Sequence, residues 1–77
     1  MRTVQMPKFS ARLKELRKEK GIKQVDMAKL FGYTEAHYQQ IEYGHVNIPA
    51  LLLEALADYF EVSTDYLLGR SDDRRTL

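Results

Sequence analysis

Apolar residues recur along this chain at intervals of three and four, the period of one face of an α-helix, with charged residues between them. The first such run, Phe9, Leu13 and Leu16, predicts an amphipathic helix over residues 8–20. Gly21 follows the last turn, at a position where glycine commonly ends a helix. The spacing therefore assigns the N-terminal part of the chain to a single helix.

Two shorter helices follow, and one glycine joins them. The first covers residues 24–31, and its apolar positions are Met27, Ala28 and Phe31. Gly32 stands where the C-cap of that helix requires a positive φ. Thr34 is a natural N-cap for the next helix, which runs to about Tyr43. The apolar face of this third helix is formed by Tyr38 and Ile41.

The remaining pattern predicts two more helices and no strand. Pro49 suits the first turn of a helix over residues 50–60, which is apolar on more than one side and is expected at the centre of the core. Ser63 is an N-cap for a short last helix that Gly69 ends. We therefore predict an all-α, five-helix domain over residues 8–69. Residues 1–7 form an N-terminal arm before it, and the polar residues 70–77 form a frayed, flexible tail.

Composition limits the domain to one small core. The chain has 77 residues and no cysteine, so neither a disulfide nor a thiolate metal site can stabilise it. It contains no apolar run long enough to span a membrane, and its first residues lack the apolar centre of a signal peptide. We expect a cytoplasmic protein without a membrane association.

The net charge of +1 hides an uneven distribution. Residues 1–29 carry nine Lys and Arg against three acids, a net charge of +6, whereas residues 30–77 carry three Arg against eight acids, a net charge of −5. Such an asymmetry predicts one basic and one acidic face, and the basic half could meet phosphates. The alternative is a solvated first helix with no binding role.

Catalytic chemistry finds no support in the sequence. The two histidines, His37 and His45, stand apart from paired carboxylates at ligand spacing, and no nucleophile motif or phosphate-binding Gly-rich loop is present. A chain of this size also has little room for a concave pocket. We expect neither an enzyme, nor a metal or cofactor site, nor a small-molecule ligand.

The second and third helices, joined by a tight turn containing Gly32, form the signature of a helix-turn-helix, whose second helix can enter a DNA major groove. With Tyr38 and Ile41 turned inward, four residues of the third helix face outward: Glu35, Ala36, Gln39 and Gln40. Gln can pair with adenine, Glu can accept from cytosine, and Ala can touch a thymine methyl group. The alternative is an ordinary polar helix face.

The whole chain resembles the lambda-repressor-like helix-turn-helix domains of the xenobiotic-response-element (XRE) class, which include phage repressors and Cro proteins. The resemblance covers residues 9–70. The motifs on which it rests are Gly-x-x-Gln at residues 21–24, the pair Ala28 and Gly32, Ile-Glu-x-Gly at 41–44, and Val-Ser-x-Asp-x-Leu-Leu-Gly at 62–69. These motifs occur in the order and at the spacing of the class.

The resemblance implies a role for each matching position. Glu35, Ala36 and Gln40 match the usual base-reading positions, often joined by Gln39. Contacts to the DNA backbone are implied for Lys23, Gln24, Thr34, His37, Tyr43, His45 and Asn47. Arg17 and Glu42 match a partly buried ion pair that ties the first helix to the third. The alternative for this pair is two independent surface charges.

The chain departs from the class in two ways. Its third helix carries no Lys or Arg, so we expect affinity to come from Gln24, Lys23, the loop 43–47 and dimerisation. Tyr38 replaces a smaller aliphatic residue, and its hydroxyl needs a partner or water if it is buried.

The function expected from these residues is that of a DNA-binding transcriptional regulator, a repressor that binds double-stranded DNA as a homodimer. Dimer contacts could come from Tyr59, Phe60, Tyr66, Leu67, the tail or the arm, although core filling is favoured for Phe60 and Leu67. The alternative function is a protein-interaction module of the antitoxin or antirepressor type, in which DNA contact is secondary.

Overall fold

A computed structural model describes residues 6–75 and contains five α-helices in that range. Their bounds are α1 Pro7–Glu19, α2 Gln24–Phe31, α3 Glu35–Glu42, α4 Ala50–Phe60 and α5 Thr64–Leu68. These bounds agree with the predicted elements to within about two residues. The described part of the chain holds no strand, so the predicted all-α fold is confirmed.

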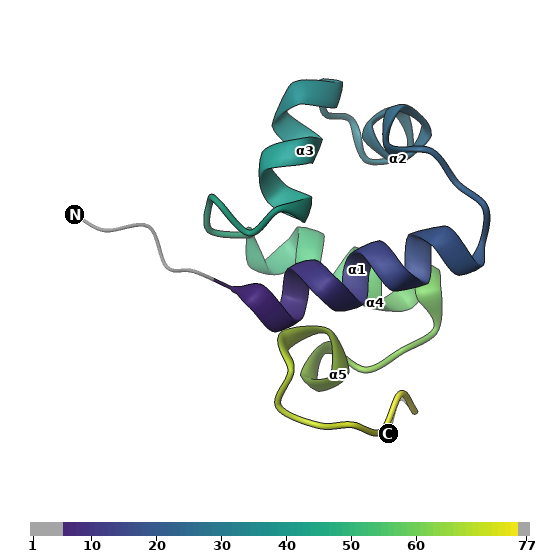
Figure 1. Cartoon of the computed structure of the whole chain (residues 1–77), viewed down its shortest axis with the longest axis vertical. Helices are drawn as coiled ribbons and strands as arrows, with labels where there is room; N and C mark the ends of the chain where they lie inside the picture. Colours follow the sequence, from purple (N-terminus) through teal and green to yellow (C-terminus); the bar gives the residue numbers. More distant parts are fainter. Residues whose placement is uncertain (1–5, 76–77) are drawn as a thin grey trace.

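The helices are arranged in two groups on either side of α1. In Figure 1, α2 and α3 lie at one end of the molecule and α5 lies at the other, with α1 crossing between them and α4 behind it. Contacts link α2 with α3, and α1 with both α3 and α5. The first helix therefore connects the two ends of the domain.

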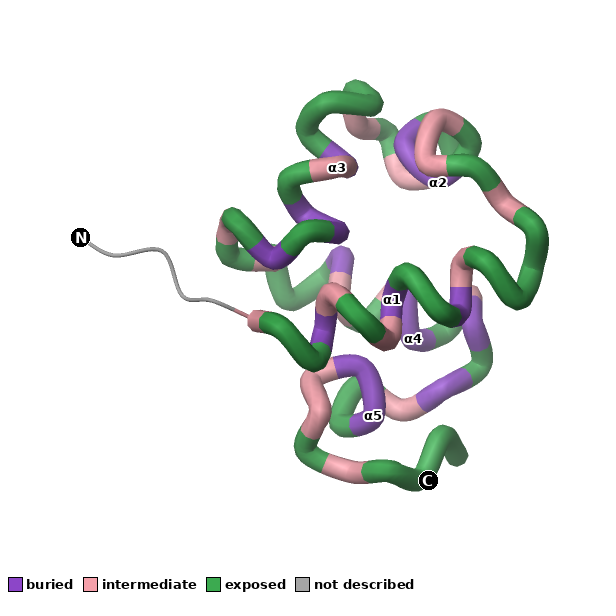
Figure 2. Tube along the Cα trace, in the orientation of Figure 1, coloured by how far each residue is buried: buried purple, intermediate pink, exposed green. Residues whose placement is uncertain are grey.

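One hydrophobic core runs between the helices, and Figure 2 shows its buried segments on their inward sides. The periodic residues Phe9, Leu13 and Leu16 of α1 are all buried there. The other members are Met27, Ala28, Tyr38, Ile41, Leu52, Leu56, Ala57, Phe60, Val62, Tyr66 and Leu67. Burial of this apolar set is the main favourable contribution to folding in a chain without disulfides.

The fourth helix buries one face rather than several. Leu52, Leu56 and Phe60 enter the core, whereas Leu51 in the first turn is 81% exposed. The sequence pattern suggested burial on more than one side, because neighbouring leucines leave the orientation of a short helix open. The first turn of α4 therefore lies at the edge of the core, and the rest of the helix packs into it with one face.

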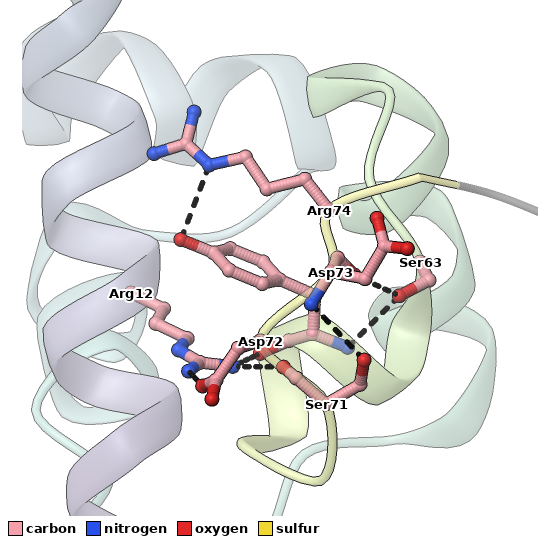
Figure 3. A network of polar contacts seen from close by, with 7 residues as sticks. Arg12, Ser63, Ser71, Asp72, Asp73 and Arg74 are labelled. Atoms are coloured by element: carbon pink, nitrogen blue, oxygen red, sulfur yellow. Dashed lines mark hydrogen bonds and ion pairs between the residues drawn. The ribbon is translucent and has the colours of Figure 1, made fainter.

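The segment after α5 differs from the frayed tail expected from its composition. Residues 70–75, called the C-terminal strap below, fold back onto α5 and α1 (Figure 3). The backbone N–H of Ser63 donates to the carbonyl of Arg74 at 2.9 Å, and Arg12 Nη1 donates to the carbonyl of Ser71 at 2.6 Å. Local polarity alone, on which the expectation of a frayed tail rests, does not indicate these contacts. Residues 76–77 and 1–5, the rest of the tail and most of the arm, lie outside the described range.

Two arginines hold the strap against the ring of Tyr66. The guanidinium carbon of Arg12 lies 4.2 Å from the ring centroid, and that of Arg74 lies 5.3 Å from it. Arg74 also donates to the Tyr66 hydroxyl at 3.2 Å and to the carboxylate of Glu19 at 2.7 Å. Cation–π contacts and charge-assisted hydrogen bonds thus add to the apolar burial of Val62, Tyr66 and Leu67 at this end of the molecule.

Candidate nucleic-acid interface

The turn between α2 and α3 is set by three consecutive local interactions. Gly32 adopts φ +77°, a left-handed conformation that L side chains rarely take, and Tyr33 N–H donates to the carbonyl of Ala28 at 2.8 Å. Thr34 then caps α3, with Oγ1 accepting from the N–H of His37 at 3.1 Å. Since the small Ala28 is buried beneath the turn, the two helices form the compact unit predicted from the sequence.

The third helix divides sharply into an inner and an outer face. Tyr38, Ile41 and Glu42 are buried. The outer face carries Glu35, Ala36, His37 and Gln40, which are exposed, and Gln39, which is half-buried. The four predicted base-reading residues therefore lie on the side of α3 turned away from the core, with Gln39 at its edge.

A buried ion pair fixes the inner face of α3 to α1. Arg17 donates from Nε to both carboxylate oxygens of Glu42 at 3.0–3.1 Å and from Nη2 to Oε1 at 3.0 Å. Its Nη1 also donates to the carbonyl of Ile22 at 2.9 Å, in the loop before α2. The pair expected from the resemblance is thus present, with side-chain exposures of 11% and 1%. It anchors α3 and the entry to α2 at one point.

Tyr38 is buried beside this ion pair without a hydrogen-bond partner. The residue is 1% exposed, and its hydroxyl forms no well-aligned hydrogen bond with another group among the described residues. Burial raises the pKa of the phenol above its ordinary value, and the negative charge of Glu42 and a weak interaction of the hydroxyl with that carboxylate add to the rise, so the phenol stays neutral. The need for a partner, anticipated from the sequence, is unmet within residues 6–75.

The half-buried edge of α3 contacts the start of α2. Gln39 Nε2 donates to Gln24 Oε1 at 3.2 Å, across the two helices. Gln24 is the first residue of α2, which has Lys23 as its N-cap and no side-chain cap. The first backbone N–H groups of an uncapped helix are left for water or an anion. This corner therefore gathers amide donors, a helix N-terminus and an exposed lysine.

The loop after α3 contacts the opposite, C-terminal part of that helix. His45 Nδ1 lies 3.2 Å from Gln40 Oε1, and the rings of Tyr43 and His45 are 5.8 Å apart. Tyr43, His45 and Asn47 are all exposed. The structure thus brings the predicted backbone-contact residues to both sides of the predicted base-reading helix.

These elements match a known domain type. The sequence profile of the family described as "Helix-turn-helix" matches residues 13–67, most of the chain. The chain belongs to the helix-turn-helix family. With its five helices and no strand in residues 6–75, its fold is the lambda-repressor-like fold that the resemblance implied.

One curated protein gives a further comparison for this helix-turn-helix domain. Over 66 residues the chain is 36% identical to the "HTH-type transcriptional regulator PrpR" of Mycobacterium tuberculosis. The match covers 83% of this chain but spans only 13% of the length of that relative. No solved structure shows significant similarity to the chain.

The charges of the helix-turn-helix domain are not segregated as simply as the sequence suggested. Arg12 and Arg17 of the basic half pair with Asp72 and Glu42 of the acidic half, and Arg74 returns to α1 to meet Glu19. Within residues 6–29 the exposed cations that remain are Lys8, Lys14, Lys18, Lys20, Lys23 and Lys29. The expectation of one basic and one acidic face therefore fails in part, because internal ion pairs join the two halves.

Sequence reasoning missed two sets of polar residues. It missed the two arginines that attach the strap, Arg12 of α1 and Arg74 of the strap itself, whose contacts join residues more than 50 positions apart. It also placed Gln39 with the base readers without foreseeing its bond to Gln24. Helical period tells which side of α3 a residue occupies, but it does not tell which neighbouring side chain it meets.

Within residues 6–75 no helix is both long and apolar enough to cross a membrane. No group of three or more His, Cys, Asp or Glu side chains in the same range could hold a metal ion.

Proposed function

We propose that this chain binds DNA in a sequence-specific manner and regulates transcription, acting as a repressor that blocks a promoter or operator. The observation that carries the proposal is the two-sided third helix. Its inner face is fixed by Tyr38, Ile41 and the Arg17–Glu42 pair, while its outer face is polar and exposed. A rigidly mounted helix with free polar side chains is what groove reading requires.

In this proposal the outer face of α3 reads base edges. Gln40 would pair with adenine through its amide, Glu35 would accept from the cytosine amino group, and Ala36 would contact a thymine methyl group. Since α3 has no positive charge, it supplies selectivity rather than general affinity.

Affinity would come from contacts to phosphates on both sides of α3. Gln24 and Lys23 lie at the uncapped N-terminus of α2, where backbone N–H groups favour an anion. The Oγ1 atom of Thr34 accepts the capping bond, which leaves the hydroxyl hydrogen free to donate. The other residues proposed for the backbone are His37, Tyr43, His45 and Asn47.

We further propose that the chain acts as a homodimer on a pseudo-palindrome. One small domain reads only about 4–6 base pairs, and two half-sites about one helical turn, ~34 Å, apart would extend the site. Phe60, Tyr66 and Leu67 are buried in the core, so they cannot also form the dimer contact suggested for them. Tyr59, which is half-buried, stays a candidate for that contact.

The relative supports the regulatory part of this proposal by its name, although the chain spans a small part of its length. The direct test is selection of bound duplexes from random DNA at low salt, followed by binding measurements over a salt series. We expect enrichment of a two-fold symmetric sequence and an affinity that falls as salt rises, because bound phosphates release counterions. Enrichment of no sequence would contradict sequence-specific binding.

A further inference from the structure

Gln39 differs from the other residues on the outer face of α3. Glu35, Ala36 and Gln40 are exposed, whereas Gln39 is half-buried, and its amide nitrogen lies 3.2 Å from Gln24 Oε1. This contact crosses from α3 to the first residue of α2. Gln40 also has a contact at 3.2 Å, with His45, but it is exposed, so half-burial together with the bond to α2 leaves Gln39 less able than Gln40 to reach a base edge.

The bond also restricts what Gln24 can do. A glutamine amide has one acceptor oxygen and an NH₂ group with two donor hydrogens. Gln39 engages the oxygen of Gln24, and the NH₂ group of Gln24 has no acceptor among residues 6–75. The NH₂ group of Gln24, the first residue of α2, is therefore the end of the amide left to bind an acceptor. Phosphate oxygens are acceptors, so the opposite orientation of this amide would place an oxygen against an oxygen.

We propose that Gln39 is a positioning residue that orients Gln24 for a phosphate, and that it does not read a base. The proposal rests on the DNA-binding function proposed above and reassigns one residue within it. By holding the Gln24 amide in its donor orientation before DNA arrives, Gln39 reduces the ordering that binding would otherwise require.

A double-mutant cycle on a selected duplex tests this assignment. We expect Gln24→Ala to weaken binding about tenfold, because it removes a hydrogen bond to a charged group. Gln39→Ala should weaken it about threefold, since the Gln24 amide stays present but unoriented. The double variant should bind no more weakly than Gln24→Ala alone, and none of these variants should change the preferred sequence.

The base-reader assignment predicts different results in the same experiment. If Gln39→Ala still weakens binding in the Gln24→Ala background, or changes the preferred base at one position, the positioning role is overturned. Gln40→Ala is the matched control, because it removes an amide from the exposed side of the same helix and should change the preferred base. A wild-type chain that binds no duplex would instead refute the proposed function itself.

Two further measurements separate positioning from a structural role. The free energy of unfolding of the same four proteins without DNA should show no comparable coupling, and an equal coupling there would make the pair merely structural. In NMR spectra, the side-chain NH₂ signals of Gln24 should shift when the duplex is added to wild type. They should shift much less in Gln39→Ala, and an unchanged shift would contradict the proposal.

Discussion

The C-terminal strap and the helix-turn-helix corner lie at opposite ends of the molecule, and their polar side chains are engaged very differently. At the strap, Arg12 and Arg74 donate to carbonyls, carboxylates and a phenol at distances down to 2.5 Å. At the helix-turn-helix end, formed by α2, α3 and the loop after α3, two contacts of 3.2 Å join uncharged or exposed groups. They lie between Gln39 and Gln24 and between Gln40 and His45. The strap is attached by charged donors, whereas the surface contacts of α3 are made by neutral side chains.

This difference suggests a division between folding, which the contacts of the strap serve, and the proposed DNA binding, which the outer face of α3 serves. A chain of this size has one core, and the polar strap lies outside it, so guanidinium groups attach the strap to α1 and α5. The corner does not need such bonds, because Tyr38, Ile41 and the Arg17–Glu42 pair already hold α3 from inside. If this view is right, changes at the strap should affect stability alone, and changes on the outer face of α3 should affect binding alone.

The Arg17–Glu42 pair joins the two ends through α1, and breaking it should have the largest effect. Arg17→Met should leave the fully buried Glu42 carboxylate without its partner and destabilise the fold by about 3–5 kcal/mol. Urea unfolding followed by circular dichroism measures the loss. Lys14→Met, on the exposed side of the same helix, is the control and should change little. A loss below about 1 kcal/mol would show that the pair is not a structural anchor.

Removing Arg12 should destabilise the strap without changing DNA recognition. Arg12→Ala leaves the carbonyls of Tyr66 and Ser71 without their charged donor, a cost of about 2–3 kcal/mol. Its bond to the fully exposed Asp72 should add little. The checks are thermal unfolding and the affinity of the folded fraction for a selected duplex. Arg75→Ala is a control, because that side chain pairs only with Asp73 within the strap. A change in the preferred sequence would contradict the separation of the two ends.

At the other end, Gln40→Ala should change binding without changing stability. A bidentate contact to one base discriminates against the wrong base by about 1–3 kcal/mol, and an exposed glutamine adds little to the core. Repeating the selection from random DNA with this variant should show a relaxed preference at one position in each half-site. An unchanged preference would remove Gln40 from the base-reading set.

Tyr38→Phe tests the inner face of α3. The buried hydroxyl has no partner in residues 6–75, and its removal should leave stability unchanged or raise it by about 1 kcal/mol. Tyr38→Leu is the contrasting variant, since it also removes part of the ring and should leave a cavity. A clear loss of stability in Tyr38→Phe would mean that the hydroxyl has a partner, such as a bound water.

The helices of both ends were predictable because each is encoded by residues close together in the sequence. Gly32, Thr34 and Ser63 mark helix ends through local backbone bonds, and Phe9, Leu13 and Leu16 mark a buried face by their period. The polar contacts of the strap and the Gln39–Gln24 bond were missed, and the Arg17–Glu42 pair was expected from the family resemblance rather than from the pattern of the residues. They join residues that only the tertiary fold brings together, and polar side chains carry no period that indicates their partner.

The smallest expected effect concerns acid and the strap. Arg74 donates to the exposed carboxylate of Glu19 and holds the pKa of that group below its ordinary value. The unfolded chain therefore binds this proton at a higher pH than the folded chain does. The stabilisation is present above about pH 4.5 and is lost as the pH falls through the lowered pKa of the folded state.

Thermal unfolding of wild type and Arg74→Gln between pH 6 and 3 tests this contact. We expect the two melting temperatures to differ most at pH 6 and to converge towards pH 3. Acid protonates Glu19 in wild type and so removes the ion pair that the substitution has already removed. High salt should reduce the difference at pH 6 as well, since the pair is exposed. A constant difference at all pH values would mean that Arg74 holds the strap through Tyr66 rather than through Glu19. The phenol of Tyr66, an uncharged acceptor, would then be the main side-chain partner of Arg74.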